Sequence, residues 1–81
     1  MRISSKPGDE GYEKYAETKD SHNCFVTLNG AIVRNVIMAD EGQGVVEVNR
    51  LGSTGRFVVI NDLIQSDTLH GTVCITLVPN A

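Results

Sequence analysis

Short runs rich in Val, Ile, Thr and Phe recur along the chain from residue 24, separated by clusters of Gly, Asn, Asp and Ser. The runs read CFVTL, AIVRNVIM, VVEVNRL, RFVVI and TVCITLV. Apolar, β-branched runs bounded by turn residues predict β-strands. Because these five runs fit within residues 24–78 with no space for helical crossovers, we expect neighbouring strands to pair antiparallel as a meander.

The segments between the first three runs predict tight turns. Asn29-Gly30 lies between the first two runs, and this dipeptide readily takes the positive φ angles of a two-residue hairpin turn. In ADEGQG, the side chain of Asp40 favours a turn, while Gly42 and Gly44 provide the torsion angles of a bulged hairpin. We therefore expect two hairpins in succession.

The last run alternates most strictly, which predicts one buried and one exposed face. Val73, Ile75 and Leu77 point one way, and Thr72, Cys74 and Thr76 point the other. Residues 61–71 are expected to form a longer connection into this strand, which Pro79 ends because proline lacks a ladder donor. The sequence predicts an all-β domain over residues 23–81: a small antiparallel five-stranded meander closing into a barrel or a strongly bent sheet.

Residues 1–22 have a different composition, because they hold nine of the seventeen Asp, Glu, Lys and Arg residues and little aliphatic content. They predict a polar N-terminal arm, removable without unfolding the domain. The stretch DEGYEKYAET allows one short helical turn, which Gly11 weakens. We expect the arm to contact a neighbouring protein, with Tyr12 and Tyr15 as amphipathic contacts. Arg2 and Lys6 complete this set of candidate interaction residues.

Charge and length narrow the possible partners. The net charge is −3 and no Lys or Arg cluster occurs, which argues against direct nucleic-acid binding. No apolar run reaches the roughly 20 residues of a membrane helix, and the N-terminus lacks the hydrophobic segment of a secretion signal, so we expect synthesis in the cytoplasm and no membrane contact. Domains of this size often need assembly for stability. We therefore expect a homo-oligomer or a component of a larger assembly.

The adjacent carboxylates Asp40 and Glu41 are candidates for binding a hard cation or for acid–base chemistry. Either use needs further oxygen ligands converging on them, and Gln43 is the only nearby polar side chain before Val45. The strand corner is therefore the favoured interpretation of this stretch.

The two histidines and two cysteines suggest a weaker alternative, a zinc site formed by His22, Cys24, His70 and Cys74. His70 and Cys74 would lie about 13 Å apart along an extended strand, and the paired spacing of zinc ribbons is missing. The favoured interpretation is therefore free, buried thiols and no metal or other cofactor.

Catalytic patterns are weak. Ser66, Asp67 and His70 lie near one another in the connection before the last strand and are candidates for nucleophilic catalysis, but such residues are also common turn formers. GSTGR, residues 52–56, precedes a strand rather than a helix, so it predicts a hairpin turn and not a phosphate loop. We therefore expect no enzyme.

The order of turns and strands in LNGAIVRNVIMADEGQGVVEV, GRFVVI and TLHGTVCI resembles small accessory proteins of tailed bacteriophages, over residues 24–77. The resemblance implies a phage accessory protein. Our leading hypothesis is a structural protein of the virion, made in the host cytoplasm: a capsid decoration or cement protein, or a minor head or tail component. Its partners would be phage capsid or tail subunits, or further copies of itself. The alternative is a phage-encoded inhibitor that covers the basic surface of a host defence or nucleic-acid enzyme.

Overall fold

The structure is a computed structural model that describes residues 1–52 and 55–80, and it is mostly β with one helix, α1 (Tyr12–Thr18). The strands are β1 (Arg2–Ser4), β2 (His22–Leu28), β3 (Ala31–Val33), β4 (Val36–Asp40), β5 (Val45–Asn49), β6 (Val59–Ile60), β7 (Leu63–Ile64), β8 (Ser66–His70) and β9 (Val73–Pro79). Across the described residues, no helix has the length and apolar character needed to cross a membrane.

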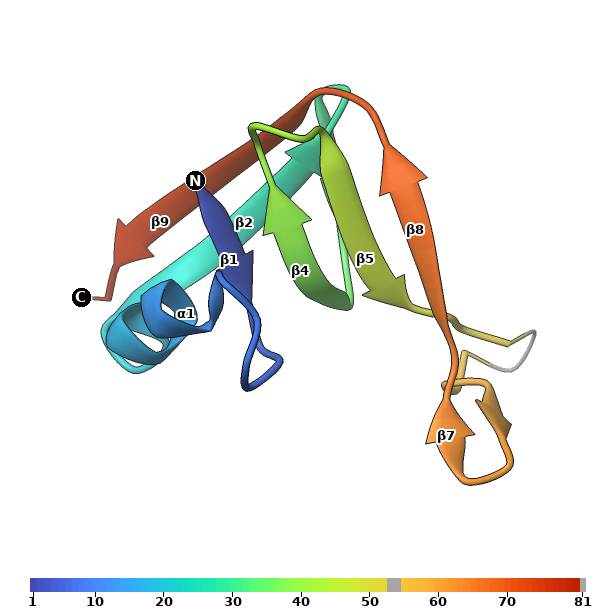
Figure 1. Cartoon of the computed structure of the whole chain (residues 1–81). Coiled ribbons are helices and arrows are strands. Elements are labelled where there is room, and N and C mark those ends of the chain that lie inside the picture. The colour runs from blue at the N-terminus through green and yellow to red at the C-terminus, as the bar shows by residue number, and fades with distance from the viewer. Residues whose placement is uncertain (53–54, 81) are drawn as a thin grey trace.

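The strands form a four-stranded sheet in the order β1-β4-β5-β8, a three-stranded sheet in the order β3-β2-β9, and a separate β6–β7 hairpin. Every strand pair is antiparallel, which confirms the predicted direction of pairing. The order is not the predicted meander, because β9 pairs with β2 and β8 pairs with β5. The predicted single strand AIVRNVIM is divided into β3 and β4, which belong to different sheets, by a break at Asn35 with a φ of 60°. The two sheets meet at one end and diverge toward the other, and the β6–β7 hairpin projects beyond the far end of β5 and β8 (Figure 1). The strands of the described residues do not join into the closed ring of a barrel.

Three turns hold the two sheets together where they meet. Asn29 and Gly30 have φ angles of 52° and 86°, which confirms the predicted hairpin between β2 and β3. The backbone N–H of Asn29 donates to Thr72 O at 2.8 Å, and the Asn29 side-chain oxygen accepts from Thr72 N at 2.9 Å. Gly71 N donates to Gly44 O at 3.0 Å, so the turns before β3, β5 and β9 form one connected cluster.

The core is small and aliphatic, and β9 contributes one face to it. Val73 is buried while Ile75 and Leu77 are half-buried, and Cys74 and Thr76 on the other face are exposed. This pattern confirms the predicted alternation. The buried cluster contains Ile3, Val26, Ala39, Val46 and Val73, drawn from both sheets.

The N-terminal residues differ from the predicted arm, because β1 is an integral strand of the four-stranded sheet. Arg2 pairs with Asp40 and Ser4 pairs with Met38, and Ile3 is only 6% exposed. A three-residue strand is too short to show periodicity, so its sequence signal is lost among the neighbouring charges. The first residues thus belong to the core of the domain.

The helix that follows β1 confirms the predicted helical turn. It begins after Gly11, and a Cβ at Gly11 would lie 2.9 Å from backbone atoms of Ile3. Ser4 N also donates to Gly11 O at 3.1 Å. The glycine that weakens the helix in the sequence is therefore needed for the close approach of α1 to β1.

The region of the predicted fourth strand is also different. Only Val59 and Ile60 of RFVVI form a strand, and they pair with β7 through a turn at Asn61 and Asp62, which have φ angles of 52° and 63°. The predicted long connection contains β8, which pairs with β5 over its whole length. The predicted turn at 52–56 includes residues 53 and 54, which lie outside the described residues.

Candidate functional site

The acidic corner between β4 and β5 is used to hold the fold together. Asp40 accepts hydrogen bonds from Gln43 N at 2.9 Å and from Arg2 Nη1 at 3.1 Å, and these two donors hold the pKa of Asp40 below its ordinary value. Glu41 accepts from Ile75 N at 2.9 Å and lies 3.2 Å from the N-terminal ammonium. The same contacts lower the pKa of Glu41. The two carboxylates thus fasten β1 and β9 to the corner.

The four candidate interaction residues near the N-terminus make contacts within their own chain. Arg2 Nε donates to Asp9 Oδ1 at 2.9 Å, and Arg2 Nη2 donates to Asp9 Oδ2 at 2.9 Å. Lys6 forms an ion pair with Glu47 on β5. The rings of Tyr12 and Tyr15 lie 5.9 Å apart, centroid to centroid, and both side chains are half-buried. The structure therefore brings Tyr12 and Tyr15 together on α1, whereas Arg2 and Lys6 pair with separate acidic residues. Tyr15 also lines a groove between the sheets.

Acid is expected to release β1 through these carboxylates. Bonding to Arg2, and then to Gly11 N, lowers the pKa of Asp9 to about 2. Because folding lowers this pKa, the ionised side chain stabilises the fold above its unfolded pKa of about 3.9, and the stabilisation is lost as the pH falls toward the folded value. The urea midpoint should therefore decline between about pH 5 and pH 2, and the decline should be shallower for Asp9→Asn. Equal slopes for the two proteins would contradict the assigned pairing.

The alternative zinc ligands do not converge. No group of three or more His, Cys, Asp or Glu side chains positioned for a shared metal occurs among residues 1–52 and 55–80. His70 lies on β8 in the other sheet from Cys24, and Cys24 and Cys74 occupy opposite faces of the β2–β9 pair, because Cys24 pairs with Leu77.

Both cysteines are free and exposed, so the prediction that they are buried was wrong. Cys74 falls on the outward face of β9, alternating with the core positions Val73 and Ile75. Cys24 points to the core side of β2, where the space between the sheets is open, and partial burial raises the pKa of its thiol.

The three candidate catalytic residues on β8 do not form a triad. Ser66 and His70 are exposed on one face of the strand, and Asp67 alternates to the other face. Asp67 accepts hydrogen bonds from Arg50 Nε at 3.0 Å and Nη2 at 2.6 Å, which lower the pKa of its carboxyl group. Asp67 therefore links β8 to the end of β5 rather than orienting His70.

Known proteins provide no guide to the site. Neither protein-family models, nor curated proteins, nor solved structures match this chain. Two apolar features of the molecule, a groove and a projecting hairpin, are the candidate binding sites.

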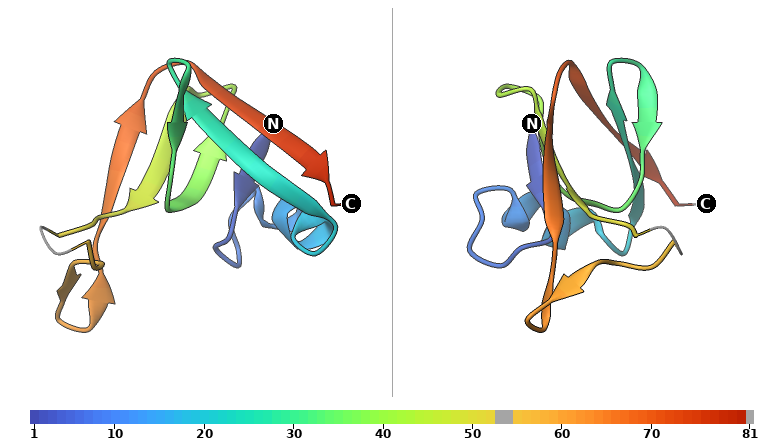
Figure 2. Two further views of the ribbon diagram at one scale, coloured as in Figure 1. Left: turned by 180° about the vertical axis from the view of Figure 1, so that it is seen from behind. Right: turned by 90° about the vertical axis from the view of Figure 1, so that its right-hand side faces the viewer.

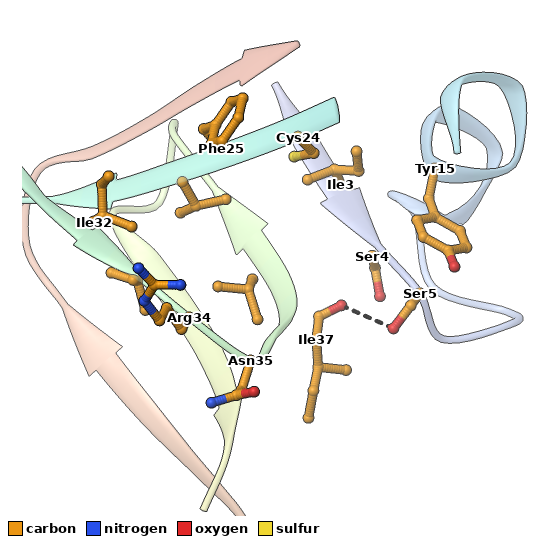
Figure 3. Close-up of a pocket in the computed structure, with 13 residues that line it drawn as sticks. Ile3, Ser4, Ser5, Tyr15, Cys24, Phe25, Ile32, Arg34, Asn35 and Ile37 are labelled. Atoms are coloured by element: carbon orange, nitrogen blue, oxygen red, sulfur yellow. Dashed lines mark hydrogen bonds between the residues drawn. The ribbon is translucent and has the colours of Figure 1, made fainter. Parts of the chain in front are cut away.

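The groove lies between the two sheets, beside α1, and has a cavity volume of about 540 Å³. Figure 3 shows Ile3, Ser5 and Tyr15 on one side of it and Ile32 and Arg34 on the other. The remaining lining residues come from the end of β1, the middle of β2, the end of β3, the segment joining β3 to β4, and the start of β4: Ser4, Cys24, Phe25, Val26, Val33, Asn35, Val36 and Ile37. Two of the strands that line the groove, β1 and β3, are edge strands of different sheets and do not pair with each other.

The second feature is the β6–β7 hairpin, which exposes large apolar side chains. Val59, Ile60, Leu63 and Ile64 are each more than half exposed, and Leu63 reaches 68%. Phe57 and Leu51, which pair at the base of the hairpin, are also exposed. The sequence predicted RFVVI as the fourth strand of the meander. The Asn61-Asp62 pair was the available signal for a separate hairpin, because both residues tolerate positive φ.

Proposed function

We propose that this protein is a non-enzymatic assembly subunit that binds other protein subunits through the β6–β7 hairpin. We further propose that it serves in a phage particle as a decoration or cement protein or as a minor head or tail component. The observation that carries the proposal is the cluster of exposed apolar side chains on a hairpin that projects from the body of the domain (Figure 1).

The energetics of the hairpin support a binding role. A two-stranded hairpin alone is at best marginally stable in water, and β6 and β7 pair with no other strand in the described residues. Burying apolar surface contributes about 25 cal/mol per Å², so covering these side chains would stabilise both the hairpin and the complex. A contiguous exposed apolar cluster of this kind is typical of a protein interaction site.

The total surface area supports the same proposal. A folded monomer of 8.8 kDa is expected to expose about 4,800 Å², whereas this chain exposes 5451 Å². The excess of about 700 Å² is close to the roughly 800 Å² that each partner buries in a standard protein interface. Only six hydrophobic residues among those described are buried, so association would supply stability that the small core lacks.

The phage assignment is supported by the resemblance of residues 24–77 and by the small β scaffold. The sequence predicts a barrel or a strongly bent sheet, and we propose that the barrel closes only in the assembly. A partner segment seated in the groove would fill the gap between the two sheets. The host-directed inhibitor stays the alternative outcome of the experiment below.

The proposal predicts that the protein is found in purified virions by mass spectrometry and that Leu63→Ser weakens its rebinding to stripped particles about tenfold or more. Val78→Ser is the matched control, because Val78 is an exposed apolar residue on β9, outside the hairpin. It should rebind like the unaltered protein. Absence from virions together with capture of one host protein in a pull-down would replace the structural role with the inhibitor.

A further inference from the structure

The apolar hairpin and the apolar groove lie on different parts of the same molecule. The hairpin projects beyond the ends of β5 and β8 (Figures 1 and 2), whereas the groove is lined by residues of β1, β3 and α1 among others. A hairpin in this position is directed away from the groove of its own chain. A second copy, however, can present its hairpin to that groove.

The shape of the hairpin suits a groove better than a flat surface. Val59 pairs with Ile64, and Ile60 pairs with Leu63. Because consecutive strand residues point to opposite faces, both faces of the hairpin are apolar and exposed. A flat partner would cover only one face. A groove with walls from two sheets covers both.

The charges at the two features are complementary. Arg34 is an exposed residue of the groove lining, and Asp62 is an exposed residue at the turn of the hairpin. Neither forms an ion pair with another residue of the described chain, whose side-chain ion pairs involve Arg2, Lys6 and Arg50 with acidic partners. A hairpin inserted tip first would bring Asp62 near Arg34.

We propose that the β6–β7 hairpin of one copy inserts into the groove of a second copy, in a head-to-tail contact. Such a contact uses two different surfaces, so it leaves one hairpin and one groove open on every pair and continues into a ring or a chain. The excess exposed surface of about 700 Å² is close to the roughly 800 Å² that one partner contributes to a standard contact. This inference rests on the proposed function, because it names the protein subunit that the hairpin binds as a second copy.

A complementation experiment tests the inference with two variants. Leu63→Glu places a charge on the hairpin and leaves the groove intact, while Ile32→Glu with Arg34→Glu places charges at the groove and leaves the hairpin intact. All three side chains are exposed, so both variants should keep the circular dichroism spectrum of the unaltered protein. Val78→Ser serves as the control variant.

Native mass spectrometry and sedimentation should show the unaltered protein and Val78→Ser as species larger than a dimer, and each charged variant alone as a monomer. An equimolar mixture of the two variants should form a dimer with one chain of each kind, because it contains one intact hairpin–groove contact. Asp62→Asn, which tolerates the positive φ of the turn, should weaken association about two- to fivefold.

Other results would overturn the inference. Continued self-association of the groove variant would show that hairpins pair with each other, and a mixture that stays monomeric would show that the groove is not their partner. A monomeric unaltered protein that still binds virions through Leu63 would retain the proposed function and remove the head-to-tail contact. Self-association by a protein that is absent from virions would remove the proposed structural role and retain the head-to-tail contact.

Discussion

Ile3→Ala is expected to lower the free energy of unfolding by about 2 to 5 kcal/mol, the usual loss for a large-to-small change in a core. Ile3 is 6% exposed and belongs to the buried cluster. A domain of 81 residues has a stability of about 4 to 12 kcal/mol. The loss of this one side chain therefore removes a large share of the total, as urea unfolding followed by circular dichroism will measure.

The same substitution at an exposed position is the control. Ile32 is 64% exposed on the edge strand β3, so Ile32→Ala should change the free energy of unfolding by less than about 0.5 kcal/mol. Removal of residues 1–20 should unfold the domain, because it deletes β1, the Arg2 partner of Asp40 and the N-terminal ammonium that pairs with Glu41. A truncated protein that retains cooperative unfolding would show that residues 1–20 are the dispensable arm expected from composition.

Gly44→Ala is expected to destabilise the fold by about 2 to 5 kcal/mol, from two separate effects. Gly44 has a φ of +63°, which costs an L-residue about 1 to 2 kcal/mol. A Cβ at this position would also lie 2.6 Å from the carbonyl oxygen of Gly71. That oxygen belongs to the backbone of the turn before β9, so it moves only if the cluster of turns between the sheets is disturbed.

Gly8→Ala separates these two effects. Gly8 has a φ of +89°, but a Cβ there would meet nothing within 4 Å. Gly8→Ala should lower the free energy of unfolding by only about 1 to 2 kcal/mol, the cost of a positive φ in an L-residue. Thermal and urea unfolding of both variants will measure the difference. Equal losses for Gly8→Ala and Gly44→Ala would mean that the contact between Gly44 and Gly71 does not constrain the turns.

The sequence predicted the turns and strands whose conformation is determined by residues close together in the chain. Asn29-Gly30 takes the two positive φ angles that this dipeptide favours, and the alternation in β9 follows from one face packing on the core. The carboxylates of the acidic corner have structural partners, in agreement with the interpretation of a strand corner. In each case a short stretch of sequence contained the whole physical reason.

The elements that the sequence could not reveal depend on distant partners. SDTLH consists mainly of residues that favour turns and loops, but it becomes β8 because all five residues pair with β5. The strand β1 exists because β4 lies beside it.

The groove likewise depends on residues that are distant from one another in the sequence. The groove brings together Ile3, Tyr15 and Ile32 from three separate elements, an arrangement that no sequence spacing indicates. The apolar run in RFVVI has the same sequence signature whether it is buried or exposed. Asn61 and Asp62 could indicate a turn after it, but only the structure shows that the hairpin is exposed.

The bond from Ile75 N to Glu41 has a consequence for solubility. β9 is a seven-residue strand at the edge of its sheet, and an unprotected edge of that length invites strand addition and fibril growth. Glu41 occupies the Ile75 N–H at 2.9 Å, and Pro79 offers no donor at the end of the strand. These two positions protect β9 against uncontrolled sheet extension along its open edge.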